Sequence, residues 1–374
     1  MSIELDKIPT PCYVCEEELL QKNLDMLDYV QRESGAKILL ALKGYAMWST
    51  FPQIGKVLHG TAASGLWEAR LGTEEMGKEV HTFSPAYIDD EVDQIAAISD
   101  HMVFNSFSQW KRFRHRVGNA SCGIRINPEY SEIETEIYNP CAKFSRLGVT
   151  LKNFEENELE GIEGLHFHTH CEQGSDVLER SLKEVESKFG KYFHRMKWAN
   201  FGGGHHITRE GYDVEKLIKL VRDFSNKYDL QVYLEPGEAI GWRVGPLVAS
   251  VVDIVHNGMD IAILDVSVSN HMPDCLEMPY RPAVRGSGEA GEFPHTYRFG
   301  GPTCLAGDFI GDFSFPEPLG TGQKVVFEDM IHYTFVKSTT FNGIKLPSLG
   351  IWTREGRFKL VKEFSYEDYR GRLS

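Results

Sequence analysis

The chain has 374 residues, of which 41% are hydrophobic and 25% are charged, and its formal net charge is −14. This is the composition of an ordinary soluble globular protein, and the length suits one large domain plus a smaller one. Because the charge is strongly negative, we expect neither nucleic acid nor an anionic membrane surface as a partner, whereas a cationic substrate suits the sign.

The amino-terminal segment, MSIELDKIPTPCYVCEEELL, lacks the basic residues and apolar core of a signal peptide. No run in the sequence approaches the roughly 18 apolar residues that cross a bilayer. The seven cysteines are scattered and odd in number, which fits reduced thiols better than a disulfide framework. We therefore expect a cytoplasmic protein without a membrane span.

Short apolar runs alternate with helical patterns between about residues 37 and 237. Amphipathic helices are predicted at 176–196 and 213–229. Strands and helices in alternation indicate parallel strands with right-handed crossovers, and eight such units make a (β/α)8 TIM-like barrel. The eight apolar runs are 37–43, 57–64, 80–85, 101–106, 122–128, 165–170, 198–204 and 232–237.

After residue 240 the pattern changes to β-branched, partly alternating segments at 244–256, 260–269 and 324–336. These segments predict an all-β domain. We therefore predict an α/β fold class, with a (β/α)8 barrel over residues 12–240 followed by a β domain over 241–374. The amino-terminal segment 1–11 is expected to join the β domain.

Four chemically useful features each fall at the carboxyl end of a different predicted strand. They are Lys43, His168, the glycine run 202–204 and Glu235. In a parallel barrel these strand ends share one face, which carries the active site. We therefore expect the four features to meet in one site.

Lys43 could be an ordinary lysine that extends its ammonium group to solvent. At the mouth of a barrel, however, partial burial would lower its pKa and make the amine reactive toward an aldehyde. The glycine run could bind a phosphate through its backbone amides, with Gly237 nearby, or it could simply form an unusual turn. The carboxylate of Glu235 could keep a pyridine nitrogen protonated.

His166, His168 and His170 alternate along one predicted strand, so they should point to the same side. Histidines at alternate positions can bind zinc, and His205 and His206 are the nearby additional candidates. The alternative is that one imidazole stacks on a flat ligand while the others make hydrogen bonds in the core. Because no set of histidines and carboxylates follows at the later strand ends, we expect no metal.

Cys304 lies in the segment GGPTCLAGDFIG, residues 300–311, with Asp308 nearby. A cysteine is commonly a small apolar residue without a chemical role. A thiol held beside a carbanion is instead a competent acid. Both interpretations stay open on these residues alone.

In combination, the motifs resemble those of the fold-III pyridoxal phosphate decarboxylases, the alanine-racemase-fold group with ornithine, arginine and diaminopimelate decarboxylases. The similarity extends from TPCYVCEEEL to TTFNG and rests on ALKGYAMW, GLHFHTHCEQGS, NFGGGHH, EPGEA and GGPTCLAGDFIG. Within the group, the sequence is most similar to the carboxynorspermidine decarboxylases, which also act on carboxyspermidine. The resemblance implies a pyridoxal 5'-phosphate enzyme of polyamine biosynthesis that converts carboxynorspermidine to norspermidine and carboxyspermidine to spermidine.

The resemblance also implies roles for individual residues. Lys43 matches the lysine that binds the cofactor as a Schiff base, and His168 matches the imidazole stacked on its ring. Glu235 matches the carboxylate that faces the pyridine nitrogen. Cys304 matches the cysteine that protonates the product carbanion across the interface of a homodimer with shared active sites. The residues that match phosphate contacts are Gly203, Gly204, Gly237 and Tyr333.

Two positions depart from the group. Glu238 replaces the arginine that usually follows EPG and helps to neutralise the phosphate, so backbone amides and Tyr333 should carry more of that task. Leu305 replaces the acidic residue that follows the cysteine in ornithine decarboxylases, which argues against ornithine. Arg281 is our candidate for contact with the carboxylate of a small cationic carboxy-polyamine. Acids that could bind its distal amines are Asp274, Glu277, Asp308 and Asp312.

Other functions stand as alternatives. One is another basic amino-acid decarboxylase of the same fold, acting on diaminopimelate, arginine or ornithine. A barrel metallohydrolase would use the histidine strand. A racemase of this fold would normally place arginine, not Glu235, at the pyridine nitrogen. A catalytically inactive homologue would not need both Lys43 and Cys304.

Overall fold

The computed structural model describes residues 3–374, which divide into two compact units. One unit spans Asn23–Ile240, and the other combines the residues up to Lys22 with Gly241–Ser374. No helix in the described part of the chain is both long and apolar enough to cross a membrane.

The unit from Asn23 to Ile240 is a closed barrel of parallel strands. Each strand pairs with the next in chain order, and the last pairs with the first. The strands are β2 (Lys37–Ala41), β3 (Gly60–Ala63), β4 (Glu79–Phe83), β5 (His101–Phe104), β6 (Ser121–Arg125), β7 (Ile162–His166), β8 (Trp198–Asn200) and β9 (Gln231–Leu234). The prediction of an α/β fold with an eight-stranded barrel is confirmed.

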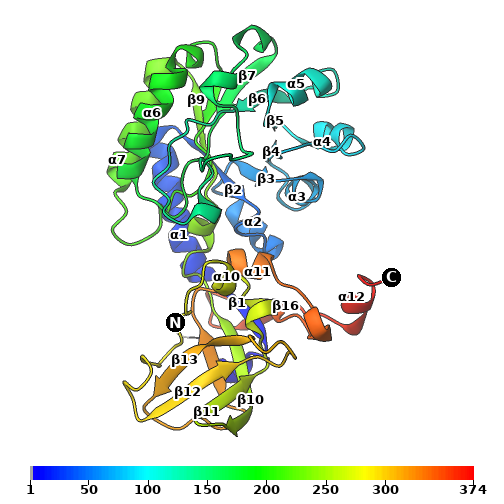
Figure 1. Ribbon diagram of the computed structural model, residues 1–374, viewed down its shortest axis with the longest axis vertical. Helices are drawn as coiled ribbons and strands as arrows, with labels where there is room; N and C mark the ends of the chain where they lie inside the picture. The colour runs from blue at the N-terminus through cyan, green and yellow to red at the C-terminus, as the bar shows by residue number, and fades with distance from the viewer. Residues whose placement is uncertain (1–2) are drawn as a thin grey trace. The chain divides into compact units, whose positions relative to one another are not determined.

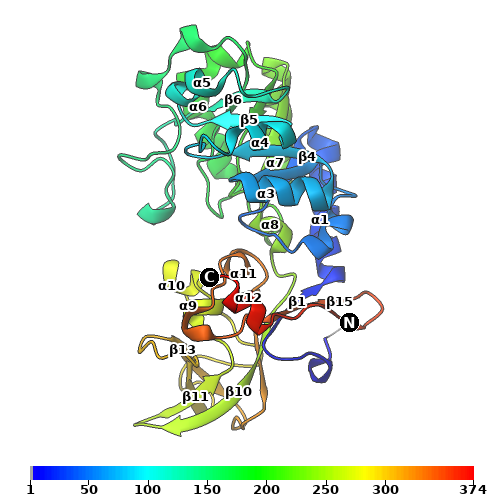
Figure 2. The same cartoon turned by 90° about the vertical axis from the view of Figure 1, so that its right-hand side faces the viewer.

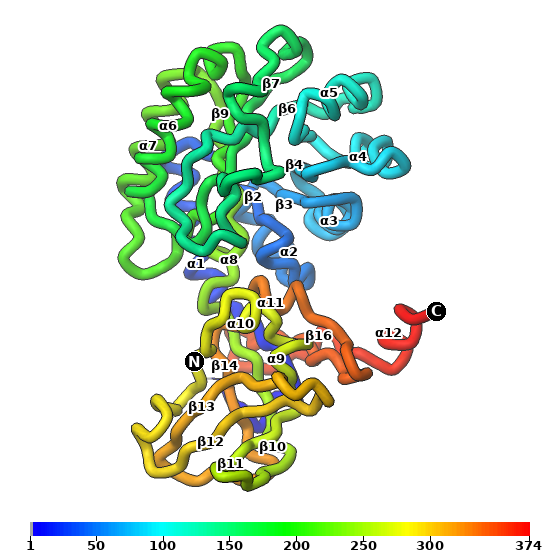
Figure 3. The backbone as a smooth tube through the Cα atoms, viewed as in Figure 1, coloured from blue at the N-terminus to red at the C-terminus, as the bar shows by residue number. Residues whose placement is uncertain are grey.

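Helices surround the barrel, with α6 and α7 opposite α3, α4 and α5 in the view of Figure 1. They are α1 (Glu17–Ser34), α2 (Phe51–Ile54), α3 (Leu66–Leu71), α4 (Val92–Ile98), α5 (Phe107–Phe113), α6 (Ser175–Phe193), α7 (Val214–Tyr228) and α8 (Glu238–Gly241). The two predicted amphipathic helices correspond to α6 and α7. The connection from β6 to β7 contains only short 3-10 turns among the described residues, and it can be followed in Figure 3 as a teal to green tube.

Helix α7 illustrates how the sequence sets these boundaries. The side chain of Asp213 accepts a hydrogen bond from the backbone N–H of Lys216 at 2.9 Å, which caps the first turn. Leu217, Val221 and Phe224 recur at spacings of four and three, so they lie on one buried face.

Inside the barrel, large side chains pack against small residues on neighbouring strands. Trp198 packs in a buried cluster with Leu39, Val103 and others, and its indole N–H donates to the Ser121 hydroxyl at 2.8 Å. The indole occupies the space above a glycine: a Cβ built on Gly164 would lie 2.0 Å from a ring carbon of Trp198. The barrel interior is therefore a packed core rather than a pore.

The second unit is an eight-stranded, mostly antiparallel sheet in the order β13-β12-β11-β10-β1-β15-β16, with β14 paired to β10. Figure 2 shows β10 and β11 side by side. The strands are β1 (Cys12–Glu16), β10 (Leu247–His256), β11 (Asp260–Leu264), β12 (His295–Gly300), β13 (Phe309–Phe315), β14 (Lys324–Phe327), β15 (Ser348–Trp352) and β16 (Phe358–Lys362). Short helices are α9 (Val268–His271), α10 (Asp274–Glu277), α11 (Tyr333–Val336) and α12 (Tyr366–Arg370).

The boundary at the amino terminus differs from the prediction that the barrel begins at residue 12. Strand β1 pairs with β10 and β15 of the sheet, and the compact unit that contains the barrel begins at Asn23. The reason is that Cys12, Tyr13 and Val14 are all buried by the sheet's apolar clusters. The amino-terminal segment that joins the β domain is therefore longer than the predicted 1–11 and extends to Lys22.

Substituting Gly164 with alanine should destabilise the barrel, because the new methyl group would overlap the Trp198 indole. We expect a loss of about 1–3 kcal/mol in the free energy of unfolding, measured by urea denaturation. Gly65→Ala is the control, since its backbone is extended and a Cβ there meets no atom within 4 Å. Equal stability of the two variants would contradict this view of the core.

Candidate active site

Lys43 lies in a tight turn just beyond the carboxyl end of β2. The turn is held in place because the N–H of Leu42 donates to the carbonyl oxygen of Ala62 at 3.0 Å. The side chain of Lys43 is accessible to solvent, yet the barrel encloses it on its other sides. This desolvation, together with the positive charge of Arg125, lowers the pKa of Lys43 below its ordinary value. The geometry therefore provides an accessible amine with increased nucleophilicity.

Glycines at the end of β8 let backbone segments approach one another without side chains between them. A Cβ on Gly203 would lie 2.5 Å from the carbonyl oxygen of Glu235, and one on Gly204 would lie 2.2 Å from that of His170. Gly204 also has a φ of +80°, which disfavours other residues. Neither position accepts a side chain, so bare amides line this part of the barrel mouth.

A second close approach joins the first and last strands of the barrel. A Cβ on Gly44 would lie 2.9 Å from Cα of Gly237, and one on Gly237 would lie 2.9 Å from the carbonyl oxygen of Ala41. The turn that carries Lys43 therefore packs directly on the EPG segment. The structure brings Lys43, Gly237 and the glycine run to the same end of the barrel, as the sequence predicted.

The imidazole of His168 is fixed beside the glycine run. Its Nδ1 accepts a hydrogen bond from the N–H of Gly203 at 3.0 Å. Burial, together with the charges of Lys43 and Arg125, lowers the pKa of His168 well below its usual range. The ring is therefore neutral, carries its proton on Nε2 and has a fixed orientation, which suits stacking on a flat ligand.

The three histidines of LHFHTH do not share one side, so that prediction is wrong. Strand β7 ends at His166, and the chain continues irregularly before the alternation is complete. Nε2 of His166 lies 3.6 Å from a carboxylate oxygen of Glu235, whereas Nε2 of His170 lies 3.2 Å from the hydroxyl oxygen of Ser181. Together with the contact of His168 described above, the three imidazoles face three different partners, which argues against a shared metal site.

Glu235 has two partners on neighbouring strands. It accepts a hydrogen bond from Nδ2 of Asn200 at 2.7 Å and pairs with His166. Burial by itself raises the pKa of Glu235, but the interactions with His166 and Asn200 outweigh it and lower the pKa to about 2. The carboxylate is therefore ionised at neutral pH. Asn200 was missed in the sequence, although a polar residue at the end of a buried strand was a usable signal.

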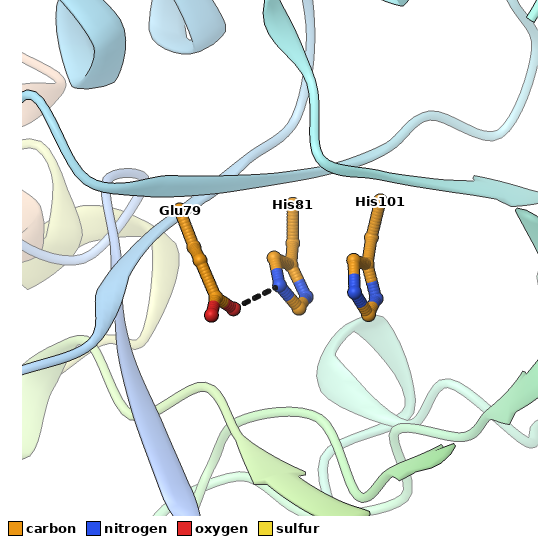
Figure 4. Close-up of side chains that lie close together, drawn as sticks. All are labelled: Glu79, His81 and His101. Atoms are coloured by element: carbon orange, nitrogen blue, oxygen red, sulfur yellow. Dashed lines mark hydrogen bonds and ion pairs between the residues drawn. The ribbon is translucent and has the colours of Figure 1, made fainter. Parts of the chain in front are cut away.

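A separate group of histidines and acids lies inside the barrel, where Glu79 and His81 of β4 adjoin His101 of β5 (Figure 4). Ligand atoms of the three side chains lie within 4.8 Å of one another. However, Glu79 already holds Lys37 at 2.6 Å and His81 at 3.2 Å. The His81 and His101 rings stack with centroids 3.8 Å apart. We therefore assign this group to charge pairing and ring stacking within the barrel.

In the sheet unit, Cys304 lies on the loop between β12 and β13 with an exposed thiol. Its backbone N–H donates to Oδ1 of Asn342 at 2.8 Å. Asp308 braces this loop: one carboxylate oxygen accepts from the Ser267 hydroxyl at 2.9 Å and the other from the Thr303 hydroxyl at 2.6 Å. Asp308 is 4% exposed, so its geometry favours a bracing role over the predicted contact with substrate.

Three other predicted residues of the sheet unit lie around Lys337, a residue that the sequence analysis did not identify: Asp274, Glu277 and Tyr333. Lys337 forms an ion pair with Asp274 and lies 2.5 Å from Oε2 of Glu277. Its ammonium lies 5.8 Å from the centroid of the Tyr333 ring, one turn earlier along the chain. Asp274, Glu277 and Tyr333 therefore form one cluster around a cation.

Arg281 is engaged within the sheet unit. Its Nη1 donates to the carbonyl oxygen of Asp312 at 2.9 Å, and its Nη2 forms an ion pair with Glu289. The guanidinium also lies 4.5 Å from the ring centroid of Phe313. Contact with a substrate carboxylate stays a prediction for this residue.

Comparison with known proteins identifies the family to which this arrangement belongs. Residues 12–331 match the family described as "Pyridoxal-dependent decarboxylase, C-terminal sheet domain". The chain belongs to the pyridoxal-dependent decarboxylases. The resemblance drawn from its motifs is confirmed, and so is the prediction of a decarboxylating enzyme.

Several relatives cover nearly the whole chain. A carboxynorspermidine/carboxyspermidine decarboxylase of Campylobacter jejuni is 50% identical over 97% of this chain and 98% of the relative. A carboxyaminopropylagmatine decarboxylase of Synechocystis is 46% identical over 99% of this chain and 96% of the relative. The solved structure of Campylobacter jejuni carboxynorspermidine decarboxylase complexed with norspermidine has a TM-score of 0.93 at 49% identity, covering 98% of this chain and 100% of that chain.

The lowered pKa of Lys43 can be tested by amine labelling in the protein freed of cofactor. Lys43 should react with acetic anhydride at lower pH than Lys111, whose hydrogen-bonded ion pair with Glu155 raises its pKa. The sign follows because a lowered pKa supplies neutral amine at lower pH. Mass spectrometry of the labelled peptides across pH 6–11 reads out both residues. Identical pH profiles would contradict the assignment of Lys43 as an activated amine.

Proposed function

We propose that this chain decarboxylates carboxynorspermidine to norspermidine and carboxyspermidine to spermidine, as a cytoplasmic enzyme. The observation that carries the proposal is the likeness, at 49% identity and over nearly the whole of both chains, to a carboxynorspermidine decarboxylase solved with norspermidine. The formal charge of −14 suits a cationic substrate. The seven free cysteines are consistent with a reducing compartment.

Pyridoxal 5'-phosphate fits the residues at the mouth of the barrel. The glycines at 203, 204 and 237 approach other backbone so closely that side chains cannot occupy the space, which leaves amides for a phosphate. Lys43 offers an amine of lowered pKa for the aldehyde, and Glu235 offers a buried anion. When bound, this cofactor accepts the electron pair that is released when the carboxylate leaves as carbon dioxide.

In the proposed reaction each residue has a separate task. Lys43 would hold the cofactor through its amine and yield that position to the α-amine of the substrate. Glu235, ionised at neutral pH, would hold a proton on the ring nitrogen. The neutral ring of His168, fixed by the Gly203 amide, would support the face of the cofactor.

The phosphate would be held mainly by backbone amides and by the hydroxyl of Tyr333. Glu238 stands where the group has arginine, and its carboxylate lies with Glu172 and His206, with one candidate ligand atom of each within 4.8 Å. A carboxylate does not neutralise phosphate. The N–H of Gly203 already donates to His168, so the amides of Gly204 and Gly237 become the main contacts, and Gly203 leaves room for the phosphate beside them.

Cys304 would give a proton from Sγ to the α-carbon after carbon dioxide has left. Its thiol is exposed on a loop in which Asp308 accepts a hydrogen bond from the Thr303 hydroxyl and Asn342 accepts one from the backbone N–H of Cys304. We propose that the enzyme is a homodimer in which Cys304 of one subunit completes the site of the other. An exposed thiol on a braced loop is consistent with a residue that acts on a partner's substrate.

The distal amines of the substrate would be recognised by carboxylates of the sheet unit. Asp274 and Glu277 already bind one ammonium, that of Lys337. A substrate ammonium could replace it, because both are compact cations that make directional hydrogen bonds. We propose Asp274 as the main contact for the distal amines. We propose that Arg281 contacts the substrate carboxylate, which leaves as carbon dioxide.

Carboxyaminopropylagmatine is a specific rival substrate, because the Synechocystis relative named for it is 46% identical. Its far end is a guanidinium group instead of an ammonium group. A guanidinium is planar and favours a carboxylate that can bind it with two parallel hydrogen bonds. The two substrates therefore differ at the end that the Asp274 cluster would contact.

A panel of substrates tests the proposal directly. The purified enzyme loaded with pyridoxal phosphate should release carbon dioxide from carboxynorspermidine and carboxyspermidine with kcat/KM at least about tenfold above that for carboxyaminopropylagmatine, a difference of about 1.4 kcal/mol. Diaminopimelate, arginine and ornithine complete the panel. Preference for any of these four other substrates would overturn the substrate assignment while leaving the decarboxylase family intact.

A subunit-mixing experiment tests the shared site. Lys43→Ala and Cys304→Ala should each be almost inactive, but an equal mixture of the two should recover about one quarter of the wild-type activity, because half of the dimers are mixed and each holds one complete site. Mixing each variant with itself is the control. A verified mixed dimer without recovery would place Lys43 and Cys304 in the same subunit's site, and an active Cys304→Ala variant would remove Cys304 from the reaction.

A further inference from the structure

His166 is the first histidine of LHFHTH and has no role in the proposed reaction so far. It is the last residue of β7, is 2% exposed and lies with Nε2 3.6 Å from Oε2 of Glu235. Among residues 3–374, neither of its ring nitrogens has a hydrogen-bond partner, and Glu235 is the carboxylate that pairs with it. A buried imidazole needs a polar partner, and the carboxylate of Glu235 is the one that the described residues provide.

Asn200 completes the surroundings of the same carboxylate from the next strand. Its Nδ2 donates to Oε1 of Glu235 at 2.7 Å, and its Oδ1 accepts from the N–H of Gly202 at 2.8 Å. The second contact fixes the amide orientation, so the donor must face Glu235. The two carboxylate oxygens of Glu235 therefore have different neighbours: His166 of β7 lies near Oε2, and Asn200 of β8 donates to Oε1.

Other charges around this pair act more weakly. Burial lowers the pKa of His166, Glu235 raises it, and the charges of Arg125 and Lys43 lower it to a smaller extent. His81, His101, His205, Lys43 and Arg125 also interact with Glu235 through their charges. The direct contacts with His166 and Asn200 therefore dominate the ionisation of the carboxylate.

We propose that His166, together with Asn200, is a positioning residue that holds Glu235 ionised and oriented, and so determines whether the ring nitrogen of the cofactor carries a proton. The inference rests on the proposed function, because it requires pyridoxal phosphate at the barrel mouth. It assigns to His166 a task distinct from that of His168, which contacts the glycine run.

His170 provides the comparison for an ordinary buried histidine. It is 1% exposed, and its Nε2 lies 3.2 Å from the hydroxyl oxygen of Ser181. No carboxylate pairs with it among the ion pairs of the described residues. Substitution of His170 should disturb packing as much as substitution of His166, without affecting Glu235.

The expected effect of substituting His166 follows from the proton that Glu235 shares with the ring nitrogen of the cofactor. Loss of the imidazole removes a favourable partner of the anionic carboxylate, while the burial that raises its pKa persists. Glu235 then binds a proton more tightly, and the proton between the carboxyl group and the ring shifts away from the ring nitrogen. A neutral ring accepts electrons less readily, so turnover slows.

The experiment measures the ¹⁵N chemical shift of the ring nitrogen in enzyme loaded with ¹⁵N-labelled pyridoxal phosphate. Wild type and the control His170→Leu should show the shift of a protonated ring at pH 7.5. His166→Leu should move the signal toward that of a neutral ring, and His166→Gln, which retains an N–H donor, should lie between. A His166→Leu variant with the wild-type ¹⁵N shift would overturn the proposal.

Asn200→Asp provides a second variant if His166→Leu does not fold. It keeps an oxygen acceptor for the N–H of Gly202 but replaces the donor to Glu235 with a like charge. We expect the same displacement of the ¹⁵N signal, and an unchanged signal would count against the proposal equally. In both variants kcat should fall about tenfold, which corresponds to one pKa unit, while KM changes much less.

The wild-type sample separates failure of this inference from failure of the proposed function. A wild-type protein that binds no labelled cofactor refutes both the proposed function and the inference built on it. A wild-type protein with a protonated ring, combined with unchanged His166 and Asn200 variants, refutes the inference alone.

Discussion

The site depends on closure of the barrel between its first and last strands. Lys37 and Ile38 of β2 pair with Tyr233 and Leu234 of β9. Beyond the strands, the N–H of Ala41 donates to the carbonyl oxygen of Pro236 at 3.1 Å, and two glycines meet backbone to backbone. This contact brings a lysine from the beginning of the barrel beside a glutamate from its end, although 192 positions (235 − 43) separate them in the sequence.

The lysine and the glutamate lie at the same end of the barrel but differ in their partners. Lys43 has no direct anionic partner among the contacts of the described residues, so desolvation lowers its pKa. Burial also acts on Glu235, but Asn200 donates a hydrogen bond to it and His166 lies 3.6 Å from it, so its pKa falls to about 2. The partners, more than the surroundings they share, decide that the pKa of the amine is lowered and that the carboxyl group is an anion.

The sequence predicted what depends on local periodicity and on strand ends. The eight barrel strands were found because apolar runs and helical patterns alternate, and Lys43, Glu235 and the glycines were found because each follows such a run. The sequence did not predict that β1 joins the sheet, since that pairing depends on residues more than 200 positions away. It also missed Asn200 and Lys337, whose importance comes from contacts across the fold, and it extended β7 too far through LHFHTH.

The central claim is that Lys43 is the residue that binds the cofactor. It is tested most directly by reducing the purified enzyme with borohydride in the presence of pyridoxal phosphate, digesting it and locating the modified lysine by mass spectrometry. The account predicts a single phosphopyridoxyl group on the peptide that contains Lys43. A modification on another lysine, or none at all, would contradict it.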